Sequence, residues 1–579
     1  MVLERFYVGL SASLHDPAIA IINSEGRVVF AEATERYLQS KRAFNCPPDH
    51  LVRTPELIEE YCHPEAELVV GISWSQPIVF LTKMMAEFSR FFSNIDAVDS
   101  FFQRLNWPWP SLPNTMTGQA SNMSLAGHSL IGNSQLKNKV KVKYYEHHLT
   151  HAANACYSSP FDRAVCAIID AYGGWGSYEF YKYEDGKIQS LKNPLFEGWG
   201  NGSLGHFYAI VCALCGFDVI KGEEWKVMGL APYGQYDQEL YQLLRPLIQV
   251  KGIDLFVNND VYFDNLAKLQ GMIRKPSSSP LEAANLAYTG QLIFTEIMQD
   301  LLTNLSDKQI SPNLILAGGC ALNSSWNGEI LQKTPFKHLH VPSAPADDGN
   351  ALGAAFLAYY DDHPDVKPSA QILSPYLGST MSTETLGNLV KFGRIKGLKY
   401  FPGTVHKEAA KLLAEGKILG WVQGKAEYGP RSLGHRSILA DPRPNDMMDK
   451  INSRVKFREQ FRPFAPSILH EFGREYFKDY QDSPYMDRTL KFKPQVIEKI
   501  PAVVHVNQTG RLQTVKREWS EKYYNLIYEF YQLTGIPLLL NTSFNIMGKP
   551  IIHSVEDAIS VFYTTGLDVL VIEDYLIEK

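Results

Sequence analysis

The sequence predicts an α/β protein of two domains, and two observations support this. A chain of 579 residues is too long to fold around one hydrophobic core. A pattern of strand, polar turn, strand, tight turn and strand occupies residues 6–34, and the same pattern recurs from residue 163. The chain is 45% hydrophobic and 20% charged, which is ordinary for a globular protein.

The recurring pattern predicts two similar hairpins. The strand segments are FYVGLS, PAIAIIN and RVVFAEAT in the first, and RAVCAIID, SYEFYKY and KIQSL in the second. Gly26 and Gly186 occupy matching tight turns, as Glu-Gly and Asp-Gly pairs. An internal duplication of this kind indicates a two-lobed, actin-like ATPase fold (the ASKHA class), with a phosphate between the two polar turns. Chance similarity of two hairpins is the alternative.

We place the N-terminal domain at residues 1–375, a linker at 376–400 and a mixed α/β domain at 401–579. The second domain has predicted strands at KILGWVQG and IPLLLNTSF, and a predicted helix at SEKYYNLIYEFYQLTG. Residues 106–135, rich in Pro, Gly, Ser and Asn, have weak periodicity and predict a long excursion, either a lid or an interface loop.

Composition argues against several classes of partner. The net charge is −6 and no Lys/Arg-rich block stands out, so we expect no nucleic-acid binding. No apolar run approaches the ~20 residues that span a bilayer, and the start lacks signal-peptide features. Seven scattered cysteines indicate reduced thiols and a cytoplasmic location. The Cys212 and Cys215 pair is expected to be two small residues on an apolar helix.

The segment EHHLTHAANA suggests a metal site. His147 and His151 have i, i+4 spacing, which places both imidazoles on one face of a helix, whereas His148 is expected at the surface. Candidate carboxylates are Asp170, at a strand end, and Asp347 or Asp348, in a glycine turn that opens a helix. This donor set suits Fe(II), Zn or Mn. An N-cap role for Asp347 is the alternative.

A possible nucleotide site lies between residues 222 and 328. Gly318 and Gly319 follow a strand and allow close backbone approach, and Asn323 can form a hydrogen bond with a nucleotide. Lys226, in GEEWKVMGLAPYG, is a candidate for the same cleft. An ordinary turn and a solvated charge pair are the alternatives.

The C-terminal domain contains cations interleaved with glycine, proline and apolar residues. They are Arg431, Arg436, Lys456, Arg458, Arg462 and Arg511, with Asn541 and Ser543 at a strand end. This pattern favours a partly buried anion site. The alternative is a set of structural ion pairs with Asp441 and Glu459.

Together these motifs resemble one family, the NodU/CmcH-type O-carbamoyltransferases. The shared sequence motifs are HD at residues 15–16, ATERYLQSKR, EHHLTHAANA, VMGLAPYG, GGCALN, DDGNALGAA, YGPRSLGHRSILADPR, VKFREQFRPFAPS and NTSFNIMGKPI. The resemblance implies an N-terminal domain similar to the threonylcarbamoyl-transfer protein Kae1 and a C-terminal domain similar to YrdC.

The resemblance also implies an activity. The YrdC-like domain would form carbamoyladenylate from carbamoyl phosphate and ATP with Mg²⁺. The Kae1-like domain would transfer the carbamoyl group to a hydroxyl of a small natural product, such as an antibiotic or a toxin. The implied carbamoyl phosphate and ATP site comprises Arg431, Lys456, Arg511 and Ser543, near Asn541.

In the N-terminal domain the resemblance implies iron bound by His147, His151, Asp170 and Asp347, with Asp348 as the alternative ligand. It implies His15 as the active-site histidine, although a turn histidine paired with Asp16 is the other interpretation. The family's D-G-T-x-R pattern is NQTGR here, with Asn507 in place of an acidic residue.

Other functions compete with this one. A tRNA threonylcarbamoyl-transfer enzyme would use the same folds, and a nucleotide-switched actin-like scaffold would use the hairpins alone. A hydrogenase-maturation carbamoyl carrier would need paired CxxC motifs, which the chain lacks. The sequence does not select the acceptor. Residues 106–135 are the candidate acceptor-specific region, and the apolar segment 79–92 is a candidate homodimer interface.

Overall fold

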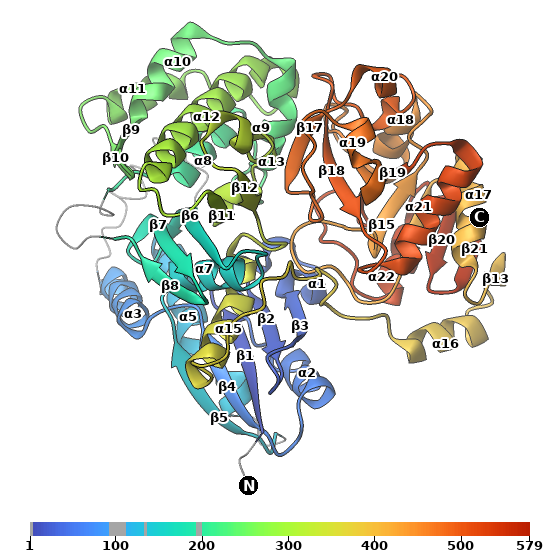
Figure 1. The fold of residues 1–579 in the computed structure, drawn as a ribbon, viewed down its shortest axis with the longest axis horizontal. Helices are drawn as coiled ribbons and strands as arrows, with labels where there is room; N and C mark the ends of the chain where they lie inside the picture. The colour runs from blue at the N-terminus through green and yellow to red at the C-terminus, as the bar shows by residue number, and fades with distance from the viewer. Residues whose placement is uncertain (1–3, 92–111, 133–135, 193–199) are drawn as a thin grey trace. The chain divides into compact units, whose positions relative to one another are not determined.

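The computed structural model describes residues 4–91, 112–132, 136–192 and 200–579 (Figure 1). The chain forms two compact units. Unit 1 comprises Met1–Thr34, Arg42–Asn323 and Ile330–Leu373, and unit 2 comprises Glu35–Lys41, Ser324–Glu329 and Ser374–Lys579. The segment Glu35–Lys41 belongs to unit 2 through contacts such as Arg36, whose guanidinium donates to the Gly429 carbonyl at 3.0 Å.

The first sheet of unit 1 is built from strands that are almost wholly buried. Its order is β3-β2-β1-β4-β5, with β2 antiparallel to β1 and β3, and with β1, β4 and β5 parallel. The strands are β1 Arg5–Ser11, β2 Ala18–Ile22, β3 Val28–Ala33, β4 Glu67–Ile72 and β5 Lys139–Tyr144. Residues such as Val8, Ile21 and Val70 form its core.

The second sheet repeats this topology. Its order is β8-β7-β6-β11-β12, with β6–β8 forming the antiparallel meander and β6, β11 and β12 parallel. The strands are β6 Arg163–Gly173, β7 Gly176–Glu184, β8 Lys187–Ser190, β11 Asn313–Ala317 and β12 His338–His340. The matching turn glycines, Gly26 and Gly186, both have φ of 81°. The predicted duplication and actin-like fold are confirmed by this strand order.

Two buried helices pack against each other in unit 1, α7 (His147–Tyr157) and α15 (Asn350–Asp362). Helix α15 also packs on β1, β2 and β4, whereas α7 packs on β6 and β11. Small residues permit this approach. A Cβ at Gly353 would collide with the Thr150 carbonyl on α7, and one at Gly9 would collide with the Ala351 carbonyl. The NALGAA sequence therefore brings α15 close to both neighbours.

The remaining elements of unit 1 surround the two sheets. They are α2 Arg53–Tyr61, α3 Gln76–Phe91, α5 Leu112–Leu125, α6 His128–Ile131, α8 Leu204–Leu214, α9 Trp225–Leu230, α10 Gln238–Leu244, α11 Tyr262–Gln270, α12 Ala284–Ser306, α14 Ile330–Lys333, and the hairpin of β9 Ile248–Lys251 with β10 Asp254–Val257. Helix α1 (Thr34–Leu38) begins at the last residue of this part of unit 1 and belongs to unit 2 from Glu35 onward. Cys212 and Cys215 are buried free thiols on α8, as expected.

The excursion at 106–135 differs from its prediction. Residues 106–111 and 133–135 lie outside the described residues, but 112–125 and 128–131 are helices. Ala120, Met123 and Leu130 are buried, and Met123 and Leu130 belong to the core of the first sheet. The loop prediction was wrong for this part because burial of a few apolar side chains stabilises a helix of otherwise polar composition.

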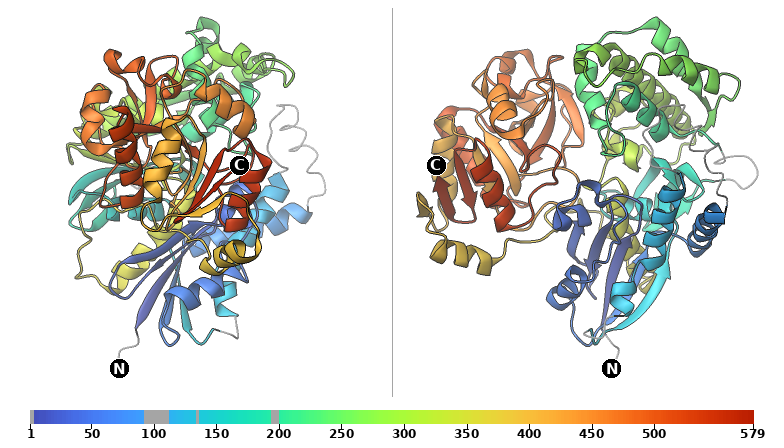
Figure 2. Two further views of the ribbon diagram at one scale, coloured as in Figure 1. Left: turned by 90° about the vertical axis from the view of Figure 1, so that its right-hand side faces the viewer. Right: turned by 180° about the vertical axis from the view of Figure 1, so that it is seen from behind.

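Unit 2 contains a mixed nine-stranded sheet of order β13-β21-β20-β14-β15-β19-β16-β18-β17, with helices α17, α21 and α22 packed beside it (Figure 2). The strands are β13 Leu398–Tyr400, β14 Leu419–Val422, β15 Arg436–Ala440, β16 Ala465–Leu469, β17 Arg488–Lys491, β18 Thr509–Val515, β19 Leu538–Ser543, β20 Val569–Ile572 and β21 Tyr575–Glu578. The helices are α13 Ser324–Asn327, α16 Thr383–Phe392, α17 Val405–Ala414, α18 Met447–Ile451, α19 Gly473–Tyr476, α20 Pro494–Ile497, α21 Glu521–Thr534 and α22 Val555–Thr564.

The predicted strands around residues 420 and 540 are β14 and β19, and the predicted helix is α21. Residues 376–400, which we treat as a linker, form helix α16 and strand β13 within unit 2. Met381 and Leu386 enter the core of this unit, so the segment is integrated with the sheet.

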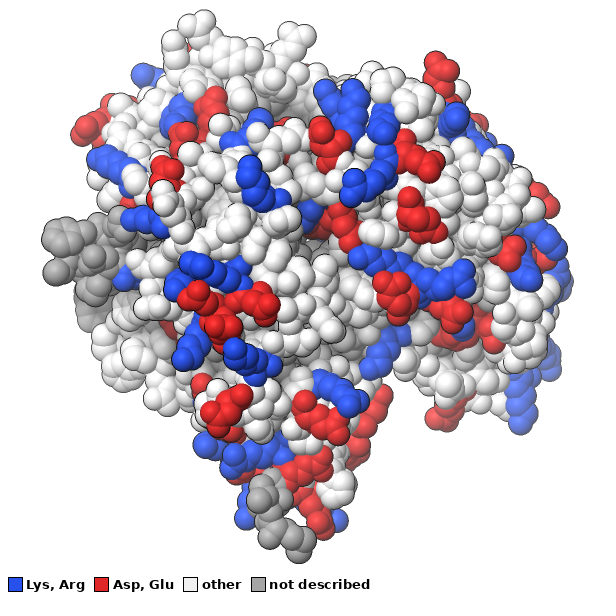
Figure 3. Space-filling model, in the orientation of Figure 1, with Lys and Arg blue, Asp and Glu red and all other residues white. Residues whose placement is uncertain are grey.

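Basic and acidic side chains are interspersed on the face drawn in Figure 3. Across the residues that the structure describes, none of the helices combines the length and apolar character needed to cross a bilayer.

Candidate metal centre and anion site

Helix α7 presents the histidine pair of unit 1. Its first turn is capped by Glu146, whose Oε2 accepts from the Leu149 amide at 2.9 Å. His147 and His151 are both buried, with side chains 1% and 0% exposed. Because they are one turn apart, their rings lie together, with centroids 4.9 Å apart.

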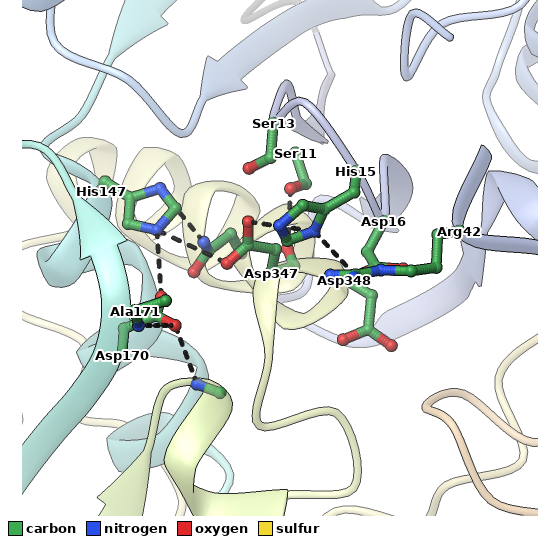
Figure 4. Close-up of polar contacts among 12 residues, drawn as sticks. Ser11, Ser13, His15, Asp16, Arg42, His147, Asp170, Ala171, Asp347 and Asp348 are labelled. Atoms are coloured by element: carbon green, nitrogen blue, oxygen red, sulfur yellow. Dashed lines mark hydrogen bonds and ion pairs between the residues drawn. The ribbon is translucent and has the colours of Figure 1, made fainter. Parts of the chain in front are cut away.

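Two carboxylates face this pair from other elements, and Figure 4 shows both beside His147. Asp170 lies on β6, and Asp347 lies in the turn before α15. Nε2 of His147 is 3.7 Å from Asp170 Oδ2 and 3.6 Å from Asp347 Oδ1. Nε2 of His151 is 3.5 and 3.4 Å from the same two atoms. The neighbouring Asp348 instead accepts the Gly349 amide at 3.1 Å, so the structure places Asp347 in the cluster.

The spacing and chemistry of these four groups fit a metal ion. Their ligand atoms lie within 4.8 Å of one another. A tetrahedral ion bonded at about 2.1 Å separates its ligand atoms by about 3.4 Å, close to the observed distances. His147 Nε2 is buried and makes no hydrogen bond within the described part of the chain. Two ionised carboxylates would balance the charge of a divalent ion, so the cluster could hold one.

The electrostatics of the pair reflect the carboxylates. Burial alone would lower the pKa of His147, but Asp170 and Asp347 outweigh it and raise this pKa to about 10. Burial would raise the pKa of Asp170, and the two histidines lower it well below its usual range. The group is therefore a set of mutually attracting charges with little access to water.

Several neighbours of this centre carry no local sequence signal. The Trp74 ring stacks on His147 with centroids 4.3 Å apart, and the Asn350 amide nitrogen lies 3.1 Å from His151 Nε2. Asp170 Oδ1 accepts the Gly319 amide at 3.2 Å. Gly319 thus positions a carboxylate of the cluster, and a Cβ there would lie 2.9 Å from that oxygen.

His15 lies at the edge of the same centre, on the loop after β1. Its Nδ1 is 2.9 Å from Asp16 Oδ2 and 4.0 Å from Asp347 Oδ2. Asp16 also forms an ion pair with Arg42 at 3.2 Å. Burial would raise the pKa of Asp16, but Arg42 and His15 lower it. A carboxylate fixed in this way can orient the imidazole.

His148 is not at the surface as expected. It is buried, 2% exposed, because α7 is covered on several sides rather than on one face. Its Nδ1 lies 3.8 Å from Glu179 Oε2.

The predicted nucleotide residues are separated into two groups in unit 1. Gly318 has φ of 87° and donates its amide to the Pro345 carbonyl, and Gly319 contacts Asp170. Asn323 exchanges hydrogen bonds with Gln291. Lys226 forms an ion pair with Glu223 at 2.8 Å. The glycine pair thus adjoins the metal cluster. Asn323 and Lys226 contact Gln291 and Glu223, which are not members of that cluster.

A cavity of about 460 Å³ begins one residue after Asp170. Ala171, Tyr172, His206 and Phe263 are among the residues that line it. Tyr172 is 75% exposed and Phe263 is 56% exposed, so aromatic surface is available to a ligand there.

Unit 2 contains the predicted cations. Lys456 is 2% exposed, and its ammonium group donates to the backbone and side chain of both Ser543 and Asn545. Arg458 donates to Asn452 at 2.7 Å and lies over the Phe464 ring. Asn545 carries no predictive motif, although it lies two residues from Ser543.

The cations influence one another. Burial lowers the pKa of Lys456, and Arg458 and Arg462 lower it further. Burial also lowers the pKa of Arg511, with further effects from Arg431 and Arg462. The five cations of this cluster are Arg431, Lys456, Arg458, Arg462 and Arg511, and Glu459 is the carboxylate that forms an ion pair with one of them, Arg462, at 3.3 Å. Such a cluster suits an anion.

Two other predicted residues have internal roles. Arg436 is fully buried and donates to four backbone carbonyls, including those of Gln423 and Ser379. Asn541 is 1% exposed and donates to Ser467 Oγ and Gln513 Oε1 inside the sheet. Asp441 pairs with Arg443, as the structural alternative expected.

The chain is similar to known carbamoyltransferases and nodulation proteins. Two family models match, the carboxyl-terminal carbamoyltransferase domain at residues 410–579 and the amino-terminal one at residues 112–356. Nodulation protein NolO of Bradyrhizobium diazoefficiens is 34% identical, over 75% of this chain and 78% of that protein. The chain belongs to the NodU-type carbamoyltransferase family.

Two further proteins are similar to this chain. An uncharacterized protein of Synechocystis sp. is 31% identical to this carbamoyltransferase, over 99% of this chain and 96% of that protein. Full-length HypF in a phosphate- and nucleotide-bound form matches with a TM-score of 0.36 and 13% identity, over 62% of this chain and 55% of that one. The strand order, rather than this distant likeness, identifies the fold.

Proposed function

We propose that this carbamoyltransferase is an ATP-dependent O-carbamoyltransferase with two separate half-reactions. In unit 2, carbamoyl phosphate and ATP with Mg²⁺ form carbamoyladenylate. In unit 1, the carbamoyl group passes from carbamoyladenylate to a hydroxyl of a small natural product, and AMP is released. The observation that carries the proposal is the cluster of five cations in unit 2, in which burial and neighbouring cations lower the pKa values of Lys456, Arg458 and Arg511.

The first half-reaction requires stabilisation of phosphate charge. Water cleaves carbamoyl phosphate to carbamate and inorganic phosphate, and a carbamate oxygen then attacks the α-phosphorus of ATP and displaces pyrophosphate. Arg431 and Arg511 supply guanidinium groups for phosphate oxygens, and Lys456 supplies a point charge. Burial strengthens each of these interactions because water screens them less.

The second half-reaction requires a base and a site for the acceptor. When His15 donates Nδ1–H to Asp16, its Nε2 can take the proton of the acceptor hydroxyl. The hydroxyl oxygen then attacks the carbamoyl carbon, and AMP leaves. His147, His151, Asp170 and Asp347 would hold a metal ion, Fe²⁺ by family resemblance with Zn²⁺ or Mn²⁺ as alternatives. When bound, it would supply Lewis-acid chemistry beside this reaction.

We propose that the acceptor molecule, apart from its reacting hydroxyl, binds in the cavity next to Asp170. Tyr172 and Phe263 offer apolar rings to a hydroxyl compound, and the adjoining carboxylate marks the end at which transfer would occur. The adenylate would lie near the same centre, beside the loop that contains Gly318 and Gly319.

Product analysis tests the proposal. Purified protein is incubated with ATP, carbamoyl phosphate and Mg²⁺ without acceptor, and pyrophosphate and AMP are measured by mass spectrometry. We expect slow release of both that depends on carbamoyl phosphate. Release of ADP without carbamoyl phosphate would overturn the proposal and favour a nucleotide-switched scaffold.

A further inference from the structure

A second set of metal-ligand types lies one residue from the first on helix α7. Glu146, at the cap of the helix, and Glu179, on β7, flank His148. One ligand atom from each residue lies within 4.8 Å of the others. This group shares no residue with the cluster of His147, His151, Asp170 and Asp347.

The imidazole of His148 makes no hydrogen bond to the described residues. The residue is 2% exposed, and Nε2 is buried without a partner. Nδ1 is 3.8 Å from Glu179 Oε2, which exceeds hydrogen-bond length. A buried polar group without a partner is unfavourable, and such groups in folded proteins usually have one. A metal ion would satisfy one ring nitrogen.

The two carboxylates are already oriented as metal ligands commonly are. Glu146 uses Oε2 to accept the Leu149 amide at 2.9 Å, and Glu179 uses Oε1 to accept from Ser190 Oγ at 2.6 Å. The second oxygen of each, Glu146 Oε1 and Glu179 Oε2, forms no hydrogen bond of ordinary length with the described residues. Hydrogen bonds from a surrounding shell that fix a carboxylate are typical of metal sites.

The hairpin turn after β6 is shaped around this group. Gly174 has φ of 60°, and a Cβ there would collide with Glu146 Oε1. A Cβ at Gly173 would lie 2.9 Å from His148 Nε2. The glycines of AYGGWG thus allow the backbone to pass directly beside the three side chains.

We propose that Glu146, His148 and Glu179 bind a second divalent transition-metal ion, Zn²⁺ or Mn²⁺, separate from the His147 and His151 centre. One imidazole nitrogen and two carboxylate oxygens are a donor set for these ions, with room for water as a further ligand. The ion fastens the start of α7 to strand β7. The competing arrangement is a protonated His148 paired with Glu179, and it requires no ion.

Metal stoichiometry distinguishes the two arrangements. Full-length protein stripped with a chelator is titrated with Zn²⁺ by calorimetry, and bound zinc is quantified by mass spectrometry. We expect two equivalents for the wild type, one for Glu179→Gln, one for His151→Ala and none for the double variant. Glu184→Gln, an exposed residue of the same strand, is expected to keep two equivalents.

Two equivalents in Glu179→Gln, or a single wild-type equivalent that only His151→Ala removes, would overturn the proposal. Glu146→Gln replaces Glu179→Gln if the latter does not fold. Anomalous scattering at the zinc edge gives an independent test on wild-type crystals, with a second peak expected beside His148 and Glu179. A single peak at His147 and His151 would contradict the proposal. These readouts do not depend on carbamoyl transfer.

Discussion

The two candidate centres of this carbamoyltransferase have opposite electrostatic character. In unit 1, Asp170 and Asp347 face two buried imidazoles, so the site attracts a cation. In unit 2, burial and neighbouring cations lower the pKa values of Lys456, Arg458 and Arg511, so the site attracts an anion. Such a contrast is what two chemically different half-reactions require, one on phosphate groups and one on a hydroxyl. Variants in unit 1 should therefore leave the proposed reaction of unit 2 intact, whereas variants in unit 2 should also stop transfer because they remove its donor.

The largest expected effect comes from Lys456→Ala. This removes a buried ammonium group that contacts Ser543 and Asn545, and with it a fixed charge beside the proposed phosphates. We expect pyrophosphate release in the presence of carbamoyl phosphate to fall by about 10³-fold. Lys450→Ala, whose partner is the exposed Asp446, is the matched control and should change the rate little. A loss of less than tenfold in Lys456→Ala would remove this lysine from the reaction.

A smaller but complementary loss is expected from His151→Ala. Removal of one imidazole should weaken metal binding and reduce carbamoyl transfer to an acceptor by about 10²-fold. Pyrophosphate release should stay within about threefold of wild type, because unit 2 is unaltered. Both rates are measured on the same preparation, with the exposed His338→Ala as control. Equal loss of both rates would contradict the separation of half-reactions.

The contrast between the units also explains what the sequence could predict. The hairpins and the pair of His147 and His151 could be predicted from the sequence because their signals are local. These signals are strand alternation, turn glycines and i, i+4 spacing. The helix at Leu112–Leu125 was missed because its sequence is rich in Ser, Thr and Asn, which are weak helix formers. Its stability comes from burial of side chains such as Met123.

Contacts in the site between segments that are far apart in the chain could not be predicted from the sequence. Local sequence could not choose between Asp347 and Asp348, since only the packing of the turn aims one of them at α7. The contacts of Trp74 with His147 and of Asn545 with Lys456 join segments far apart in the chain. His148 was predicted to be exposed because a single helix pattern does not reveal how many neighbours cover it.

A third prediction sharpens the assignment of the anion site. Burial lowers the pKa of Arg431 to about 10, and its guanidinium forms no hydrogen bond or ion pair with the described residues. An incoming phosphate would compensate this burial, so Arg431→Gln should raise KM for carbamoyl phosphate by about 30-fold. Arg517→Gln, an exposed arginine that stacks on Tyr524, is the control. An unchanged KM would place the substrate elsewhere in the cation cluster.

The smallest predicted effect concerns the pH dependence of stability in unit 2. His435 is buried, with Nδ1 2.7 Å from the Lys425 carbonyl and Nε2 2.7 Å from Ser520 Oγ, and its ring stacks on Tyr376. Burial lowers its pKa to about 4, although Glu427 opposes the shift. The unfolded chain therefore takes up this proton first as the pH falls. Stability is complete above about pH 6.5 and declines toward pH 4.

Between pH 7.5 and 5.5 this linkage should lower the free energy of unfolding by roughly 1 kcal/mol. Urea denaturation followed by tryptophan fluorescence measures it, because Trp421 is buried in unit 2. His435→Gln should remove that part of the pH dependence, whereas His338→Gln at an exposed site should not. An equal slope in wild type and His435→Gln would mean that His435 is protonated in the folded protein. Its ring would then add a buried positive charge to unit 2, and the difference in charge between the two units would depend on pH.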